Sequence, residues 1–235
     1  MQIEVVFFDA GGTLLYPDPP VGQVYADALR EAGIDAEPAE VQERFQETWQ
    51  RLVRRRASGE LEYGGTEAEA KRWWRRVVRE CFSDYGPVDS FDEMFAGLWE
   101  HFASGDAWGV YEDVAPTLSA LREAGKGVGM ISNWDARLER VLRDLGMDEE
   151  LDWIVISHQI GTEKPGEPIF REALRRAKVP AGRALHVGDS YEEDVVGAQR
   201  AGLSAVWLRR DPIREPAPSA VPCVESLCGV LQLVQ

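Results

Sequence analysis

The 235-residue chain has few cysteines, few basic residues relative to its acids, and no long apolar run. Its three cysteines, Cys81, Cys223 and Cys228, form an odd and sparse set, which does not indicate a disulfide framework. We expect them to be free and structural. No stretch approaches the ~20 apolar residues that a membrane helix needs, so we expect no membrane association.

Acidic residues outnumber basic ones by 41 to 26, which gives a formal net charge of −15. Nucleic acids and anionic membranes bind positively charged surfaces, so we expect neither as a partner. The N-terminus, MQIEVVFFDA, lacks the basic start, apolar core and small-residue cleavage site of a signal peptide. These features predict a cytoplasmic protein, and the sequence leaves open whether it is a monomer or a homodimer.

Five short apolar runs predict the strands of a buried parallel sheet. Each run is almost continuously apolar, as in strands covered on both faces, and helical patterns separate the later ones. This alternation indicates a doubly wound, Rossmann-like α/β fold. The predicted strands are IEVVFF (3–8), GVGMIS (127–132), WIVIS (153–157), ALHVG (184–188) and SAVWL (204–208), and the predicted helices are 114–125, 136–146, 168–177 and 193–202. A proline-rich irregular segment (211–222) and a short C-terminal helix (224–234) are expected to follow.

Residues 16–105 interrupt this alternation, because they hold no clear strand and show four helical patterns instead. We therefore expect an all-helical domain at 16–105, inserted into a core made of residues 1–15 and 106–235. Two stretches within it are rich in Arg and Trp, which could suggest contact with nucleic acid. Packing of the tryptophans inside the helical bundle, with the arginines facing solvent or paired with glutamates, is the stronger interpretation. The predicted helices of the insertion are 21–33, 38–58, 66–85 and 90–104.

Polar side chains follow four of the predicted strands at their carboxyl ends, where open parallel sheets bind ligands. An Asp directly after a buried strand is costly unless it is hydrogen-bonded or bound to a cation. A Mg²⁺ ion would relieve the repulsion among the acids, and a lysine would add neutralisation. This layout is typical of phosphoryl transfer. The residues are Asp9, Ser132-Asn133, Lys164, and Gly188-Asp189-Ser190 with the acids at 192–194.

These motifs, in this order, resemble those of the haloacid dehalogenase-like (HAD) hydrolase superfamily, in the subgroup with a helical cap inserted after the first motif. The resemblance covers essentially the whole chain. LHVGDSYEEDVVGAQRAGL (185–203) and ISNWD (131–135) are especially similar to one branch of the superfamily. The resemblance implies a HAD core, a hydrolase that acts on a small phosphorylated molecule, and Mg²⁺ as the cofactor.

The resemblance also implies a role for each motif residue. Asp9 would be the nucleophile that forms an aspartyl-phosphate, and Lys164 would neutralise both Asp9 and the phosphate. Thr13 would support the active-site loop. The implied catalytic residues are Asp9, Thr13, Ser132, Asn133 and Lys164; the implied substrate-binding residues are Ser132, Asn133 and Lys164; and the implied metal contacts are Asp9, the carbonyl of Gly11, Asp189 and, beside it or through water, Asp194.

One position departs from the family pattern. Family phosphatases usually carry a second Asp two residues after the nucleophile, which protonates the leaving group and later activates water; here that position is Gly11. The substrate could have a good leaving group, such as an acyl phosphate, or Tyr16, Asp18 or His101 could supply the proton. A weak catalyst or a non-catalytic binding protein is a further alternative.

Relatives that cleave carbon–halogen bonds also lack this Asp, so a metal-independent 2-haloacid dehalogenase is another alternative. The acids at 189–194 are typical of a metal site, which dehalogenation does not need. The sequence therefore favours a Mg²⁺-dependent phosphatase.

Overall fold

The structure is a computed structural model that describes residues 2–58, 60, 66–210 and 221–234. The chain divides into two compact units: unit 1 comprises Met1–Tyr16 and Val110–Gln235, and unit 2 comprises Pro17–Gly109. Two short paired strands, β2 (Leu15–Pro17) and β3 (Trp108–Val110), carry the chain from one unit to the other and back. The sequence predicts neither strand. The role of residues 16–105 as a cap stays a prediction.

Unit 1 is built on a six-stranded sheet with the strand order β5-β4-β1-β6-β7-β8, and its described pairs are parallel. The doubly wound α/β fold expected from the sequence is therefore confirmed. The strands are β1 (Val5–Phe8), β4 (Gly127–Ser132), β5 (Trp153–Ile156), β6 (Ala184–Gly188), β7 (Ser204–Leu208) and β8 (Cys223–Val224). Only the two-residue β8 lacks a predicted counterpart among them, because it is too short to show a pattern.

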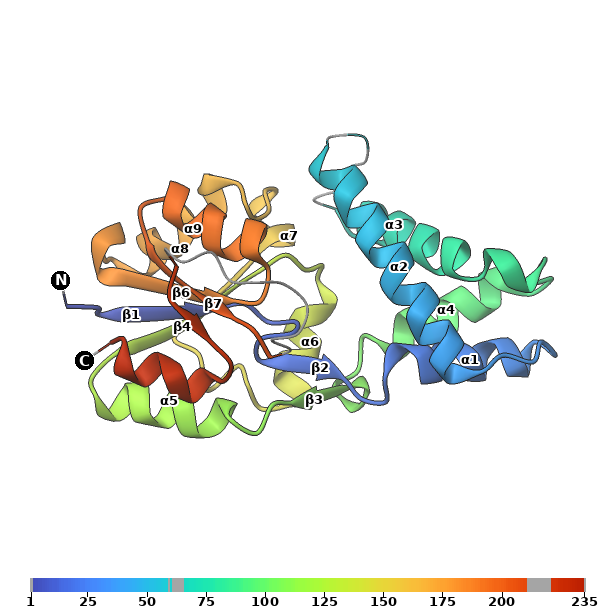
Figure 1. Cartoon of the computed structure of the whole chain (residues 1–235), viewed down its shortest axis with the longest axis horizontal. Coiled ribbons are helices and arrows are strands. Elements are labelled where there is room, and N and C mark those ends of the chain that lie inside the picture. The colour runs from blue at the N-terminus through green and yellow to red at the C-terminus, as the bar shows by residue number, and fades with distance from the viewer. Residues whose placement is uncertain (1, 59, 61–65, 211–220, 235) are drawn as a thin grey trace. The chain divides into compact units, whose positions relative to one another are not determined.

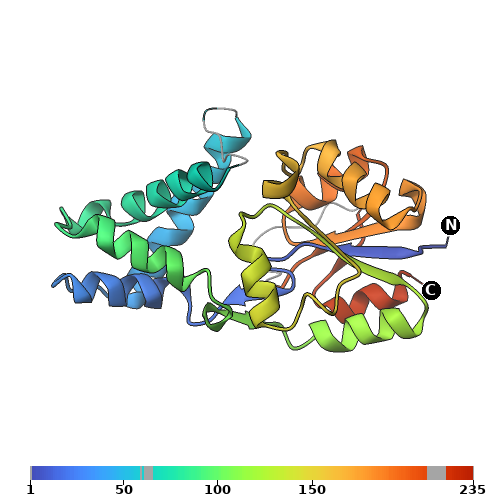
Figure 2. The same ribbon diagram turned by 180° about the vertical axis from the view of Figure 1, so that it is seen from behind.

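Helices cover both faces of this sheet, with α8 and α9 on one side and α5 and the C-terminal η5 on the other (Figures 1 and 2). Successive side chains of a strand point to opposite faces, so Phe7 packs against Phe170 of α8 while Phe8 points the other way. The elements are α5 (Val114–Glu123), α6 (Arg137–Asp144), α7 (Ser157–Ile160), α8 (Glu167–Ala177), η3 (Ala181–Arg183), η4 (Tyr191–Val196), α9 (Gly197–Arg200) and η5 (Leu227–Gln232).

The last part of unit 1 differs from the sequence prediction. The single helix expected at 193–202 begins instead as a π-helix, η4, and continues as α9. Short π-helical segments are rare and occur often at functional sites. The helix expected at 224–234 is a shorter 3₁₀ helix, η5, which buries Leu227 and Val230. Most of the irregular segment expected at 211–222 lies outside the described residues.

The described residues of unit 2 between β2 and β3 form helices and turns. The third helix starts at a capping box, in which Thr66 and Glu69 exchange side-chain-to-backbone hydrogen bonds. The helix expected at 66–85 ends at Cys81 and is followed by a short 3₁₀ turn. The elements are α1 (Val21–Glu31), α2 (Pro38–Ala57), α3 (Glu67–Cys81), η1 (Ser83–Tyr85), α4 (Phe91–His101) and η2 (Gly105–Ala107). No helix that the structure describes is long and apolar enough to cross a membrane.

The tryptophans of α2 and α3 pack against one another inside unit 2. Trp73 is buried, and Trp49 stacks on Trp74 with ring centroids 5.4 Å apart and an interplanar angle of 14°. Arginines of the same helices pair with acids, as in the contact of 3.1 Å between Arg51 and Glu80. Both observations agree with the packing interpretation of the Arg- and Trp-rich stretches.

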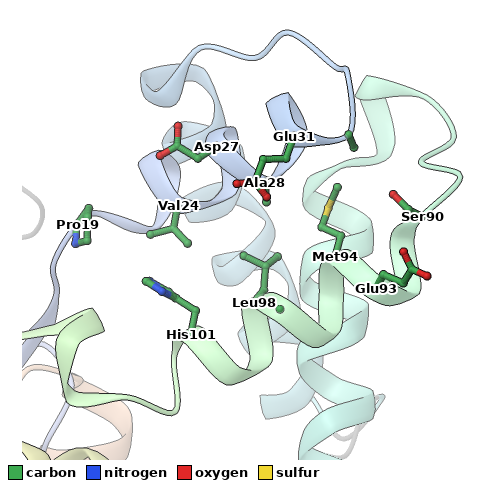
Figure 3. Close-up of a pocket in the computed structure, with 12 residues that line it drawn as sticks. Pro19, Val24, Asp27, Ala28, Glu31, Ser90, Glu93, Met94, Leu98 and His101 are labelled. Carbon is green, nitrogen blue, oxygen red and sulfur yellow. The ribbon is translucent and has the colours of Figure 1, made fainter.

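A groove of about 610 Å³ lies between α1 and α4 of unit 2 (Figure 3). Apolar side chains, among them Val24, Met94 and Leu98, line it together with Asp27 and Glu93. His101, one of the proton donors considered from the sequence, stands at one end of this groove (Figure 3).

Candidate active site

Asp9 directly follows β1 and Ser132 is the last residue of the neighbouring strand β4, so both lie at the same edge of the sheet in unit 1. The register pairs Phe8 of β1 with Met130 of β4 and with Val187 of β6. Asp9 comes next, and its backbone N–H donates to the carbonyl of Val187 over 2.9 Å. Asp9 is only 9% exposed and Ser132 only 2% exposed. The first two predicted motifs thus lie side by side at the carboxyl end of the central strands.

Lys164 forms a buried bridge between two carboxylates. Its Nζ atom donates to Oδ1 of Asp9 and to Oδ1 of Asp194, each over 2.6 Å. The side chain of Lys164 is 1% exposed. Burial alone would lower the pKa of Lys164, but the charges of Asp194 and Asp9 outweigh it and raise that pKa. Lys164 is therefore a fixed positive charge beside Asp9.

Asn133 holds the backbone of Lys164 from both sides. Its Oδ1 atom accepts from the N–H of Lys164 over 2.7 Å, and its Nδ2 atom donates to the carbonyl of Lys164 over 2.9 Å. Nδ2 also donates to Oε2 of Glu193 over 2.9 Å. Glu193, which is half-buried, thus takes part in fixing Asn133.

Asp194 is buried, and its carboxylate is held by three donors. Besides Lys164, Nε2 of His186 lies 2.9 Å from its Oδ1 atom, and the backbone N–H of Ser190 donates to its Oδ2 atom over 2.9 Å. Burial alone would raise the pKa of Asp194, but Lys164 and the hydrogen bond with His186 outweigh it and lower that pKa. The ring of His186 also packs edge-on against the ring of Phe170.

Three carboxylates converge at this edge of the sheet. Oxygen atoms of Asp9, Asp189 and Asp194 all lie within 4.8 Å of one another. Asp189 is an exposed residue, yet the protein around its carboxyl group reduces hydration there, and together with the charges of Asp9 and Asp194 this raises its pKa. Burial likewise raises the pKa of Asp9, against the opposing effect of Lys164. The three acids outnumber the one lysine that neutralises them. Their carboxylate oxygens are the ligands that a hard divalent cation such as Mg²⁺ prefers.

The loop after Asp9 comes very close to Asp189. Gly12 has a φ of +73°, and a Cβ atom at this position would lie 2.6 Å from Oδ2 of Asp189. Only glycine adopts such a φ without steric cost and leaves room for this approach. The next residue, Thr13, is fully buried, and its Oγ1 atom donates to Oδ1 of Asp189 over 3.5 Å.

Arg210 fixes the same loop through the backbone carbonyl of Thr13. No signal in the sequence pointed to this residue. Its Nη2 atom donates to the carbonyl of Thr13 over 2.7 Å and to Oδ1 of Asp113 over 2.8 Å. Its Nη1 atom donates to Oδ2 of Asp113 over 3.1 Å, and its guanidinium lies 3.6 Å from the ring centroid of Tyr111. Asp113 and Arg210 are 97 positions apart in the chain, and neither belongs to a readable motif.

Six of the eight predicted site residues thus make a direct contact with another of the eight, and the proximity of their carboxylates brings the two groups of contacts together. The other two, Gly11 and Ser132, lie next to them by chain position and sheet register. Of the proton donors considered from the sequence, Tyr16 belongs to unit 1 and packs against Tyr111 at 4.7 Å, whereas Asp18 and His101 belong to unit 2. The six linked residues are Asp9, Thr13, Asn133, Lys164, Asp189 and Asp194. Their individual roles stay predictions.

Comparison with known proteins identifies the family of this chain. The sequence pattern described as haloacid dehalogenase-like hydrolase matches residues 3–202, so the chain belongs to the HAD-like hydrolases. The mouse protein called haloacid dehalogenase-like hydrolase domain-containing protein 3 is 34% identical over 223 residues, which cover 94% of this chain and 86% of the mouse protein. This is the branch that segments 131–135 and 185–203 resemble, so that prediction is confirmed.

Other similar proteins carry names that point to different chemistries. A protein of Methanopyrus kandleri called glyceraldehyde 3-phosphate phosphatase is 33% identical over 230 residues, covering 92% of this chain and 88% of that protein. A solved HAD phosphatase from Thermococcus onnurineus is 25% identical, with a TM-score of 0.67, and covers 99% of this chain and 98% of its own. A solved 2-haloacid dehalogenase from Pseudomonas syringae is 28% identical, with a TM-score of 0.64 and the same coverage.

Proposed function

We propose that this HAD-like hydrolase is a Mg²⁺-dependent phosphatase that acts on a small phosphorylated metabolite through an aspartyl-phosphate on Asp9. The observation that carries the proposal is the buried contact of 2.6 Å between Lys164 and Asp9, with two further carboxylates close by. The lysine favours the ionised form of this carboxylate, and an ionised carboxylate beside a cluster suited to a cation is equipped to attack an electron-poor phosphorus atom.

In this mechanism the residues of the chain supply a nucleophile and fixed charge. One oxygen of Asp9 attacks phosphorus, and the bond from phosphorus to the leaving oxygen of the substrate breaks, so that this oxygen departs with the bonding electron pair. Lys164 offsets the negative charge that Asp9 and the phosphoryl group bring together. The hydroxyl of Ser132 and the backbone N–H of Asn133 bind the phosphoryl oxygens, because the side chain of Asn133 already donates to Lys164 and Glu193. Thr13 holds the loop in place. Water then attacks phosphorus, which releases phosphate and restores the carboxylate of Asp9.

Asp9, Asp189 and the carbonyl of Gly11 would hold Mg²⁺, which would draw charge from the phosphoryl oxygens when bound. The three hydrogen bonds that Asp194 accepts favour a different role for this residue, because they occupy its oxygens. Asp194 would position Lys164 and act on the metal only indirectly. The cytoplasmic location, the cap role of residues 16–105 and the monomeric or homodimeric state belong to this proposal and stay predictions.

Metal-independent dehalogenation of a 2-haloacid is the second candidate. Two observations favour it: Gly11 offers no acid, and the dehalogenase from Pseudomonas syringae is 28% identical to this chain. The convergence of Asp9, Asp189 and Asp194 weighs against it, because dehalogenation gains nothing from a third carboxylate near the nucleophile. We therefore place phosphatase activity first.

A direct test compares phosphate release and halide release by the same preparations. The panel would include glyceraldehyde 3-phosphate, acetyl phosphate, 4-nitrophenyl phosphate and 2-chloropropionate, each with Mg²⁺ and with EDTA. We expect phosphate release that requires Mg²⁺ and that falls on the order of 10³-fold or more in Asp9→Asn. The matched control is Asp148→Asn, which changes an exposed acid and should keep wild-type rates.

Water labelled with ¹⁸O distinguishes the two chemistries under single-turnover conditions. A phosphatase places the label in the released phosphate, because water attacks phosphorus. A dehalogenase that forms an ester on Asp9 places it in the carboxylate, because water attacks the carbonyl carbon. Halide release in EDTA with label in Asp9 would overturn the phosphatase proposal.

A further inference from the structure

Trp134, the residue after Ser132 and Asn133, lies against the loop that carries the nucleophile. A Cβ atom placed on Gly11 would be 3.5 Å from Cζ3 of Trp134, an ordinary van der Waals contact. Trp134 as a whole is partly exposed. The side of the site next to Gly11 is therefore bordered by an aromatic ring.

The backbone of Trp134 is firmly held. Its N–H donates to Oγ of Ser157 over 3.1 Å, and its carbonyl accepts from the same hydroxyl over 3.1 Å. The N–H of His158 donates to this carbonyl as well, over 3.3 Å. Ser157 itself is buried. These bonds from α7 fix the position from which the indole extends, as expected for a side chain that shapes a binding site.

Among the residues that the structure describes, the two ionisable groups with the largest effect on the pKa of Asp9 are Lys164 and Asp194, and both are already hydrogen-bonded. Lys164 donates to Asp9 and Asp194, Asp194 accepts from three donors, and Asp189 stands in the carboxylate cluster. An indole ring edge has no proton to transfer, and neither has Gly11. The wall formed by Gly11 and Trp134 can therefore bind a leaving group but cannot protonate it.

We propose, on the basis of the proposed function, that this wall restricts the enzyme to phosphate compounds whose leaving oxygen departs as a stable anion without taking up a proton, such as acyl and aryl phosphates. Trp134 packs against the organic part of such a substrate and determines specificity. An oxygen of Asp9 forms the new bond to phosphorus. The bond from phosphorus to the leaving oxygen breaks, and its electron pair leaves with the carboxylate or phenolate. Water then cleaves the aspartyl-phosphate and its proton passes to solvent.

The first test is a series of phosphates with leaving groups of graded acidity, from acetyl and 4-nitrophenyl phosphate through phenyl phosphate to alkyl phosphates. In the wild type, log kcat/KM should fall steeply as the leaving group becomes more basic. Gly11→Asp should flatten this dependence and raise turnover of alkyl phosphates by about 10²-fold, because it adds a general acid. The added Cβ atom would meet only an ordinary contact with Trp134, and Gly11→Ala, which adds this atom without an acid, is the control for the fold.

A shallow dependence in the wild type overturns the inference, since it means that another residue protonates the leaving group; loss of activity in Tyr16→Phe, Asp18→Asn or His101→Gln would then identify that residue. A different result would refute the proposed function itself. If no phosphate in the series is hydrolysed in an Asp9-dependent way, both the proposed phosphatase activity and this inference are wrong.

The second test separates a binding wall from a structural tryptophan. Trp134→Leu should raise KM for 4-nitrophenyl phosphate about 10-fold, change KM for acetyl phosphate much less and leave kcat within a few-fold, because only the aromatic contact is lost. Trp134→Phe should restore most of the difference. The matched control is Trp153→Leu, whose ring packs on Phe7 at the start of β5, and it should change neither KM. Equal effects of the two leucine variants would refute the role of Trp134.

Discussion

The Nζ atom of Lys164 lies 2.6 Å from Oδ1 of Asp9, although the two residues are 155 positions apart in the chain. Both are buried, so this contact is made where charge is poorly hydrated. A buried carboxylate without a cation is strongly disfavoured, and it tends to take up a proton instead. The contact therefore favours the ionised form of the proposed nucleophile and also contributes to the stability of the fold.

Replacing Lys164 by Met should destabilise the protein by about 3–5 kcal/mol at pH 7, because it leaves Asp9 and Asp194 buried without their cation. Without the cation, burial raises the folded-state pKa values of these carboxyl groups above their unfolded values. The destabilisation is then present at neutral pH and shrinks as pH falls and the groups take up protons. Urea unfolding in EDTA at pH 7 and pH 5 measures both effects. Lys178→Met, at an exposed lysine, is the matched control and should cost little. A loss below about 1 kcal/mol for Lys164→Met would contradict the argument.

Asn133→Ala should lower kcat about 10²-fold while KM changes little, because the backbone of Lys164 loses both of its bonds to this side chain. Steady-state kinetics on 4-nitrophenyl phosphate gives the two constants separately. Glu193→Gln keeps an acceptor for Asn133 and should retain most activity. A raised KM with unchanged kcat would show instead that Asn133 acts mainly by binding the substrate.

The sequence predicted the central sheet well, because strands buried on both faces leave continuous apolar runs. Strands β4, β6 and β7 have the predicted bounds. It also predicted which residues meet at the sheet edge, since the strands of a parallel sheet have their carboxyl ends at the same edge. Short strands such as β2 and β8 escaped prediction, because two or three residues show no periodicity.

Contacts between distant and individually ordinary residues also escaped prediction. Arg210 and Asp113 each look like a surface charge, and only the fold brings them together behind Thr13. Glu193 stands in an acidic run whose π-helical turn aims it at Asn133, which no sequence pattern signals. Pairing of side chains depends on packing, and a single sequence does not encode packing in a readable way.

Gly12→Ala tests the close approach of the nucleophile loop to Asp189. A Cβ atom would lie 2.6 Å from Oδ2 of Asp189, and φ is +73°. Gly125→Ala is the matched control, because it has a φ of +71° and nothing within 4 Å of the added atom. Both should lose about 1 kcal/mol of stability to the backbone conformation. Only Gly12→Ala should also weaken Mg²⁺ binding, measured by calorimetry, because Asp189 must move away. Equal Mg²⁺ affinities in the two variants would mean that this approach does not shape the metal site.

Arg210→Met tests how the nucleophile loop is fixed from behind, and its effect should depend on pH. Burial alone would raise the pKa of Asp113, but Arg210, the N–H of Leu227 and the hydroxyl of Ser226 together lower it. A carboxyl group whose pKa is lowered by folding stabilises the protein at pH values above its pKa in the unfolded chain, which is about 4 for Asp. This stabilisation is lost as the pH falls through the pKa of the group in the folded protein. The variant should therefore be less stable than the wild type by about 2–3 kcal/mol at pH 7. The difference should narrow between pH 4 and pH 2.5 without vanishing, because the bond from Arg210 to the carbonyl of Thr13 does not titrate. Urea unfolding of both proteins across this pH range measures the difference in stability. The control for loss of a positive charge is Arg209→Met, which changes the neighbouring arginine that lies over Trp207. A difference that stays constant with pH would show that Arg210 stabilises the loop through Thr13 and Tyr111 rather than through Asp113.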